Sequence, residues 1–240
     1  MAILKVWKDY GITSTEFAKK LKLENNFNKI CFAGRLDPLA QGEMIFLTDQ
    51  DTKSVSDYLG HNKTYKFSLI LGIKTTSHDC FSKIEGLTDT RNLDKNTIDT
   101  FIKNYNSQEY PLVSSYTIEH DGIKNPLWWF YANGYTKDQL NIPSKVVSIL
   151  NYSVHDITVK DTRTLSEQFI SKIKLIENID LKTQEYINQW GNIGVNYSHI
   201  VIDMEMNVNS GFYIRKFCND FGEYIGIGAI AYDITRIGFN

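Results

Sequence analysis

Alternation of hydrophobic and polar residues marks several β-strands along the chain. Between residues 63 and 72, Tyr, Phe and Leu occupy every second position, and Thr, Lys and Ser fall between them. This period of two is typical of a half-buried strand that ends at Gly72. A short apolar run at residues 3–7 indicates another strand. Further strand material lies at residues 146–152, 154–159 and 199–206.

Helices are predicted between these strands. Thr13 or Ser14 can begin a helix, because a hydroxyl accepts hydrogen bonds from the free backbone amides of a first turn. Residues 162–190 are mostly polar with scattered apolar positions, so we expect a helical segment that is less integrated with the rest. Since strands and helices are interspersed without regular strand–helix alternation, the pattern predicts an α+β fold. Helical spacing also occurs in residues 98–105, 128–131 and 214–225.

The most unusual stretch of the chain is residues 30–44, ICFAGRLDPLAQGEM, whose glycines and proline predict a loop. Asp37 precedes Pro38 and is therefore biased toward extended geometry. Gly34 permits a sharp approach, and Leu36 can anchor the loop from beneath. An isolated Asp-Pro is ordinarily only a turn, but this loop presents one carboxylate from a stiffened backbone. That arrangement suits a nucleophile or a base.

The stretch GRLDPLAQG resembles the catalytic loop of the TruB family of tRNA pseudouridine synthases, which commonly reads G-x-L-D-P-x-A-x-G. Each further motif is weak alone, but together they follow the family's order over residues 3–238, apart from one insertion. In the first half of the chain they are Lys8, Gly11 and Thr13-Ser14, then Lys63-Thr64-Tyr65, residues 72–79 and residues 111–134. In the second half they are Ser210-Gly211-Phe212-Tyr213-Ile214-Arg215, residues 220–229, and Arg236 in the closing position.

The resemblance implies the pseudouridine synthase catalytic fold, an α+β domain with a central mixed, mainly antiparallel sheet flanked by helices. It also implies an isomerisation of uridine to pseudouridine in RNA. The N1–C1′ glycosidic bond breaks, the uracil rotates, and C5 bonds to C1′. No redox change or group transfer occurs, so we expect no cofactor and no metal. The expected substrate is the T-loop uridine 55 in the T-arm stem-loop of tRNA, with no protein partner and no membrane contact.

The resemblance makes Asp37, Tyr65 and Arg215 the catalytic residues. Asp37 is the expected nucleophile or base after base flipping, and whether it attacks the base or the ribose stays open. Arg215 suits as its partner, because a guanidinium stays charged and can bind a carboxylate through two hydrogen bonds. Tyr65 is expected to stack on the extruded uracil, which is worth about 1–3 kcal/mol. The alternative for Tyr65 is ordinary core, since it shares a strand face with Phe67.

A second set of residues is expected to bind the substrate. Lys8 and Lys63 are candidates for phosphate or loop contacts, and Asp79 either orients groups around the base or caps a loop. Phe32 stands where the family usually has a histidine that helps to extrude the base, and Asp9 replaces the usual proline after the N-terminal lysine. The complete expected set is Lys8, Phe32, Gly34, Arg35, Leu36, Lys63, Asp79 and Arg236.

We expect residues 1–240 to form a single catalytic domain. A segment of about residues 108–145 takes the place of the family's mobile thumb, although Trp128 and Trp129 within it fit a hydrophobic anchor equally well. An insertion at about residues 160–196 interrupts the strand region. The chain ends after the catalytic domain, so we expect no PUA module and an RNA affinity that is weaker and more sensitive to salt.

Composition adds a constraint on charge. The 26 Lys and Arg residues are balanced by 28 Asp and Glu, and the net charge of −2 excludes a wholly cationic surface. RNA binding therefore requires a local cationic cleft, for which Lys8, Arg35, Lys63 and Arg215 are the candidates. The three cysteines contain no CxxC pair, which favours a reduced, intracellular compartment over a disulfide framework or a metal cluster. With no long apolar run, we expect a cytoplasmic protein.

Two other functions stay open from the sequence. The triplet Arg35-Leu36-Asp37 also resembles the G-R-L-D loops of the RsuA and RluA pseudouridine synthases, which perform the same chemistry on other RNAs. The other alternative is a degenerate synthase that acts as a non-catalytic RNA chaperone. The set of Asp37, Tyr65 and Arg215 disfavours it, because binding alone does not require all three.

Overall fold

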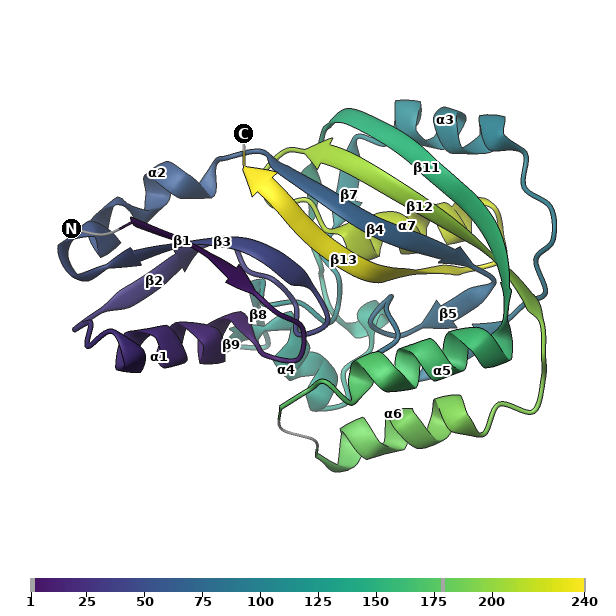
Figure 1. Ribbon diagram of the computed structural model, residues 1–240, viewed down its shortest axis with the longest axis horizontal. Helices are drawn as coiled ribbons and strands as arrows, with labels where there is room; N and C mark the ends of the chain where they lie inside the picture. The colour runs from purple at the N-terminus through teal and green to yellow at the C-terminus, as the bar shows by residue number, and fades with distance from the viewer. Residues whose placement is uncertain (1–2, 178–179, 240) are drawn as a thin grey trace.

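A central sheet carries the loop at residues 34–40 that contains Asp37 (Figure 1). The computed structural model describes residues 3–177 and 180–239. Within them, neighbouring strands of the sheet run antiparallel, except that β13 lies parallel to β3, with Thr235 opposite Gln41 and Arg236 opposite Gly42. The expected mixed, mainly antiparallel sheet is confirmed. Its order is β1 (Ile3–Lys8), β3 (Gln41–Thr48), β13 (Ala229–Phe239), β4 (Lys63–Leu71), β12 (Ser198–Val208) and β11 (Ile149–Asp161), with β2 (Ile30–Ala33) also paired to β3.

Helices and small hairpins surround this sheet. The helices are α1 (Ser14–Glu24), α2 (Val55–Leu59), α3 (Lys95–Asn104), α4 (Leu127–Ala132), α5 (Thr162–Ile173), α6 (Leu181–Gly191) and α7 (Ile214–Tyr224), with 3₁₀ turns at Asp49–Ser54 and Lys137–Gln139. Three strand pairs lie outside the sheet: β5 (Ile73–Thr75) with β6 (Ile84–Leu87), β7 (Ser107–Glu109) with β10 (Ser144–Val146), and β8 (Thr117–His120) with β9 (Ile123–Pro126). In the part of the chain that the structure describes, no helix is long and apolar enough to cross a membrane.

The main hydrophobic core lies between one face of the sheet and α7. Phe67 and Leu69 of β4 point into it, as the alternation along β4 predicts. The ring of Phe67 meets Phe217 of α7 edge-on, with centroids 6.2 Å apart. Phe221, one helical turn further along α7, is buried in the same core. This packing fixes the start of α7, where Arg215 lies, against the sheet.

The α5–α6 hairpin covers the other face of the sheet. Figure 1 shows the two helices side by side along the sheet, and their buried residues Phe169 and Trp190 pack in one cluster with Ile70 of β4 and Ile230 of β13. The prediction of helices in residues 162–190 is confirmed, but the prediction of weak integration is wrong. Leu165, Phe169 and Ile173 of α5 and Trp190 of α6 share one buried side of the hairpin. Residues 178 and 179, within the expected insertion, lie outside the described residues.

The stretch at residues 30–44 is a loop only between its two strands. Residues 30–33 and 41–44 belong to β2 and β3, which pair antiparallel with Phe32 opposite Phe46. Gly42, a loop signal in the sequence, lies inside β3 at φ +131°, where a Cβ would collide with the backbone of Arg236. The glycine therefore permits the close approach of β13, a strand that the hydrophobic pattern does not predict.

Residues 110–142 form a small lobe with its own hydrophobic cluster. Phe130 and Leu127 of α4 are fully buried in it, so the expected helix in the aromatic segment is confirmed. Trp129 packs against this cluster, whereas Trp128 is half exposed. Only one of the two tryptophans thus takes part in a hydrophobic anchor.

The partly buried His78 leads to a prediction about stability. Burial, followed by the positive charge of Arg215, lowers the pKa of His78 to about 3. In the unfolded chain His78 binds a proton below about pH 6.5, whereas in the folded protein it stays neutral until a much lower pH. Because acidification adds a proton to the unfolded state alone, it lowers the free energy of unfolding. We expect His78 to remove about 2 kcal/mol from the free energy of unfolding between pH 6.5 and pH 5. Urea denaturation at both pH values measures this.

The matched variants are His78→Asn and His155→Asn. His78 has φ +64°, a conformation that asparagine tolerates, and His155 is exposed. His78→Asn should flatten the dependence of stability on pH, and His155→Asn should leave it unchanged. An unchanged dependence in His78→Asn contradicts the prediction.

Candidate active site

The loop between β2 and β3 is held by short polar contacts from the N-terminal segment. The Ser14 hydroxyl donates to the carbonyl of Leu36 (2.8 Å) and accepts from its amide (2.9 Å). The Gly11 amide donates to the carbonyl of Pro38 (2.9 Å). The side chain of Leu36 is buried in the main core, as expected of an anchor beneath the loop. These contacts leave Asp37 between two fixed neighbours.

Lys8 is wholly buried behind the same loop. Its Nζ donates to the carbonyls of Ala40 (2.7 Å), Asp9 (3.0 Å) and Asp37 (3.2 Å). Burial lowers the pKa of Lys8 to about 8, although the charge of Asp37 acts in the opposite direction. Of the two roles open to Lys8, the structure shows the loop contact, because a buried ammonium cannot reach a phosphate.

Arg236 supports the loop from the other side. Its Nε donates to the carbonyl of Glu43 (2.7 Å), and its terminal nitrogens donate to the carbonyls of Gly34 (3.3 Å) and Arg35 (3.4 Å). The side chain has no exposed surface. We expected Arg236 to bind substrate, but the structure places it under the loop, where its donors are taken by backbone carbonyls.

Lys63 is also buried, next to Gly34 rather than next to Asp37. Its Nζ donates to the carbonyls of His61 (2.6 Å) and Leu59 (3.5 Å). Burial lowers the pKa of Lys63 to about 8, and the charge of Arg236 lowers it further. Lys63 therefore holds the chain before β4, and its Nζ also lies 3.5 Å from the Ser210 hydroxyl.

Arg215 joins Asp37 to two further segments. Its Nε donates to Oδ2 of Asp37 (2.7 Å), and its terminal nitrogens donate to the carbonyls of Ser77 (2.5 Å) and Val113 (3.0 Å). Arg215 thus pairs with Asp37 as expected, through one of the two hydrogen bonds that a guanidinium can give a carboxylate. Burial lowers the pKa of Arg215, but the carboxylates of Asp37 and Asp79 outweigh burial and hold that pKa above its usual range.

The two carboxylates beside Arg215 have different surroundings. The Asp37 side chain is 41% exposed, whereas the guanidinium that binds it is buried. Asp79 lies deeper, with Oδ2 3.6 Å from Nε of Arg215. Its Oδ1 accepts from the Ser77 hydroxyl (2.5 Å) and the Phe81 amide (2.9 Å). Burial raises the pKa of Asp79, and the charge of Arg215 opposes this. The hydrogen bonds from Ser77 and Phe81 show that Asp79 caps its own loop.

The remaining expected residues lie at the edges of this site. Tyr65 is 7% exposed in the main core, and its hydroxyl joins none of the hydrogen bonds described above. Phe32 packs edge-on against Phe46, with ring centroids 6.0 Å apart. The exposed guanidinium of Arg35 lies over the Phe32 ring, 5.2 Å from its centroid. The structure thus brings Asp37, Asp79 and Arg215 together, with Tyr65, Phe32 and Arg35 outside that cluster.

Two residues at the site escaped the sequence analysis as functional candidates. Tyr213 precedes α7, and burial, followed by the charge of Asp37, raises its pKa to about 12. Nζ of Lys145 lies 5.1 Å from the ring centroid of Tyr213 and 5.4 Å from that of Tyr110. Burial lowers the pKa of Lys145 to about 8, and none of the ion pairs among the described residues includes it. Tyr213 lies in the quoted Tyr-Ile-Arg motif, whereas no sequence signal marks Lys145.

Known proteins resemble this chain in sequence. The family model for the N-terminal domain of TruB family pseudouridylate synthases matches residues 19–164. A tRNA pseudouridine synthase B from Blochmanniella pennsylvanica (strain BPEN) is 28% identical over 238 residues, which are 98% of this chain and 73% of the relative. A tRNA pseudouridine synthase B from Malacoplasma penetrans (strain HF-2) is 24% identical over 224 residues, covering 92% of this chain and 77% of the relative.

Solved structures share the fold. A chain of a Cbf5-Nop10-Gar1 complex matches with a TM-score of 0.55 and 15% identity, over 99% of this chain and 48% of the other. A chain of an H/ACA RNP bound to a substrate RNA containing 2′-deoxyuridine matches with a TM-score of 0.53 and 15% identity, over 99% and 47%. The chain spans about half the length of these solved chains. At this identity, the likeness concerns the fold alone.

The buried position of Arg215 predicts a large effect on stability. Arg215→Met leaves Asp79 buried without its cation, and removing one partner of a buried pair costs about 3–5 kcal/mol. We expect the free energy of unfolding in urea to fall by that order at pH 7, and by less at acidic pH, where Asp79 takes up a proton. Arg35→Met is the control, because Arg35 is exposed, and it should change stability by less than about 0.5 kcal/mol. Equal stability of the two variants contradicts the assignment.

Proposed function

The chain belongs to the TruB family of pseudouridylate synthases, and we propose that it isomerises uridine to pseudouridine in tRNA, at T-loop position 55, with Asp37 as the reacting carboxylate. The observation that carries the proposal is the half-exposed Asp37 carboxylate, whose cationic partner Arg215 is buried and whose loop is held by hydrogen bonds from Ser14 and Lys8. A reacting group must be reachable and yet held in one orientation. The relatives named tRNA pseudouridine synthase B support tRNA as the class of RNA.

The proposed reaction rearranges atoms within one nucleotide. The bond between N1 and C1′ breaks, the uracil turns, and C5 bonds to C1′. The hydrogen on C5 is lost and N1 gains one, so the composition of the nucleotide is unchanged. Asp37 acts as nucleophile or base in this sequence. Arg215 holds the Asp37 carboxylate in place, because its buried Nε donates a hydrogen bond to Oδ2 of Asp37.

The extruded uracil needs an aromatic surface to replace its stacking in the RNA. Tyr65 is the proposed stacking residue. Its position supports this, since Tyr65 on β4 lies opposite Arg236, whose guanidinium binds the carbonyls of Gly34 and Arg35 in the Asp37 loop. Tyr213 offers a second, partly exposed ring beside Asp37.

The lobe at residues 110–142 is the proposed grip on the RNA stem-loop. It adjoins the reacting groups directly, since the carbonyl of Val113 accepts from Arg215. Lys145, at the base of the lobe in β10, is the proposed contact for a backbone phosphate. Its ammonium is half-buried over two tyrosine rings and has no carboxylate partner among the described residues, so an anion from outside can pair with it.

Replacement of Asp37 tests the chemistry. Asp37→Asn keeps the size of the side chain but removes the charge, so pseudouridine formation should fall by about 10³-fold or more. RNA affinity should stay within about twofold, because phosphate contacts dominate binding. The assay incubates protein with a T-arm stem-loop and with full-length tRNA, and maps pseudouridine by carbodiimide-dependent primer-extension stops. Equal product from Asp37→Asn removes Asp37 from this role, and no product from the native chain on any tRNA overturns the proposal.

Replacement of Lys145 tests the phosphate contact. The pKa of about 8 means that Lys145 is a cation below pH 8 and becomes neutral above it, so the RNA affinity of the native protein should fall between pH 7 and pH 9. Lys145→Met should weaken binding, reduce the salt slope by about one ion and flatten the dependence of affinity on pH. Lys95→Met, which removes an exposed lysine of α3, should match the native protein. A Lys145→Met variant with native affinity and salt slope rejects the contact.

A further inference from the structure

The α5–α6 hairpin reaches the rear of the Asp37 site. A cavity of about 10 Å³, roughly the space of one water molecule, lies under the site. The residues that line it include Asp37 and Arg215 of the site together with Lys172 of α5 and Asp233 of β13. A side chain from a helix beyond the sheet therefore faces the same enclosed space as the reacting carboxylate.

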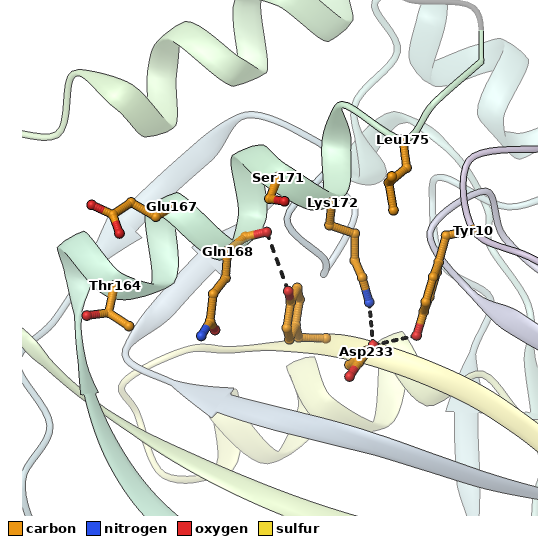
Figure 2. Close-up of a pocket in the computed structure, with 9 residues that line it drawn as sticks. Tyr10, Thr164, Glu167, Gln168, Ser171, Lys172, Leu175 and Asp233 are labelled. Atoms are coloured by element: carbon orange, nitrogen blue, oxygen red, sulfur yellow. Dashed lines mark hydrogen bonds and ion pairs between the residues drawn. The ribbon is translucent and has the colours of Figure 1, made fainter.

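Figure 2 shows the surroundings of Lys172: its side chain points from α5 to Asp233, and Tyr10 lies beside the pair. Nζ of Lys172 forms an ion pair with Asp233 and lies 3.6 Å from the ring centroid of Tyr10 and 4.6 Å from that of Tyr232. The Tyr10 hydroxyl donates to the same carboxylate. Although burial raises the pKa of Asp233, the hydrogen bonds from Lys172 and Tyr10 outweigh it and hold that pKa below its usual range.

The backbone of Asp233 adopts an unfavourable conformation that these contacts stabilise. Asp233 has φ +55°, at an irregularity in the pairing of β13 with β4. Residues other than glycine adopt this left-handed conformation at a cost of order 1 kcal/mol, and they keep it only where neighbouring contacts enforce it. Lys172 and Tyr10 supply contacts of that kind.

A second connection runs through the backbone of Gly11. The Glu177 amide, in the turn after α5, donates to the carbonyl of Gly11 (3.2 Å), and the Gly11 amide donates to the carbonyl of Pro38 (2.9 Å). Gly11 has φ +91°, and a Cβ there would collide with the carbonyl of Leu175. One residue thus contacts the hairpin on one side and the Asp37 loop on the other.

We propose that Lys172 is a positioning residue for the isomerisation. With Asp233 and Tyr10 it holds the turn at residues 10–11, and that turn orients Asp37 through the hydrogen bond between Gly11 and Pro38. Lys172 touches no substrate in this arrangement. Misplacement of a reacting group by about 1 Å can cost on the order of 10²-fold in rate, so loss of this support lowers the rate of the chemical step rather than RNA affinity. The inference rests on the function proposed above.

The test compares Lys172→Met with Lys174→Met. Lys174 lies at the same end of α5 but is exposed, so both variants remove one cation and only one breaks the cluster. In Lys172→Met, hydrogen exchange at the amides of Gly11 and Leu36 should accelerate by about tenfold, and the single-turnover rate on T-arm RNA should fall by about tenfold. The dissociation constant for that RNA should stay within about twofold. Lys174→Met should match the native protein, and Lys172→Arg should restore most of the rate, because it keeps the cation.

Each outcome decides the inference. Native exchange and native rate in a folded Lys172→Met overturn it, and so does a parallel loss of rate and RNA affinity. Should Lys172→Met not fold, Tyr10→Phe decides, because it removes only the hydroxyl that binds Asp233. It should accelerate exchange at Gly11 and slow the rate by about threefold, and native behaviour in it overturns the inference. Hydrogen exchange needs no substrate, so a native chain that forms no pseudouridine overturns the proposed function and leaves the test of Lys172 intact.

Discussion

Arg215 binds Asp37 from a buried position, and the need to satisfy the hydrogen-bond donors of this guanidinium determines how the site is assembled. A buried guanidinium is costly unless its donors find acceptors, so three segments must come together around it. The loop between β2 and β3 supplies the Asp37 carboxylate, the loop after β5 supplies the carbonyl of Ser77, and the small lobe supplies the carbonyl of Val113. Assembly of the site therefore depends on correct packing of the start of α7 against the sheet.

Buried cations support the loop that carries Asp37. Lys8 and Arg236 direct their donors at backbone carbonyls of this loop, and Lys63 does the same for the chain before β4. Lys8 and Lys63, which we expected in a cationic cleft, are thus enclosed in the protein. The net charge of −2 therefore says little about RNA binding. The positive charge that RNA can reach near the site comes from the half-buried Lys145 and from Arg35, which is exposed beside the loop.

Prediction from the sequence succeeded where the physical cause is local. Alternation along β4 and the helical spacing in α7 identify the core faces, because both periods come from backbone geometry. Prediction failed where contacts between distant segments determine the structure. The pattern of residues 229–239 does not predict β13, and Gly42 reads as a loop signal although it permits the approach of β13. The polar α5–α6 segment looks peripheral until its apolar residues are placed against the sheet.

The sequence by itself determined the family, the α+β class, the loop that presents Asp37 and the choice of Arg215 as its partner. These features follow from short motifs and from periodicity, and both depend only on residues close together in the sequence. Only the tertiary structure decided that Lys8 and Arg236 are buried supports, that Arg215 shares its donors among three segments, and that Lys172 lies behind the site. Burial and ion pairing depend on residues far apart in the chain, and their cost or benefit is set only when folding removes those groups from water.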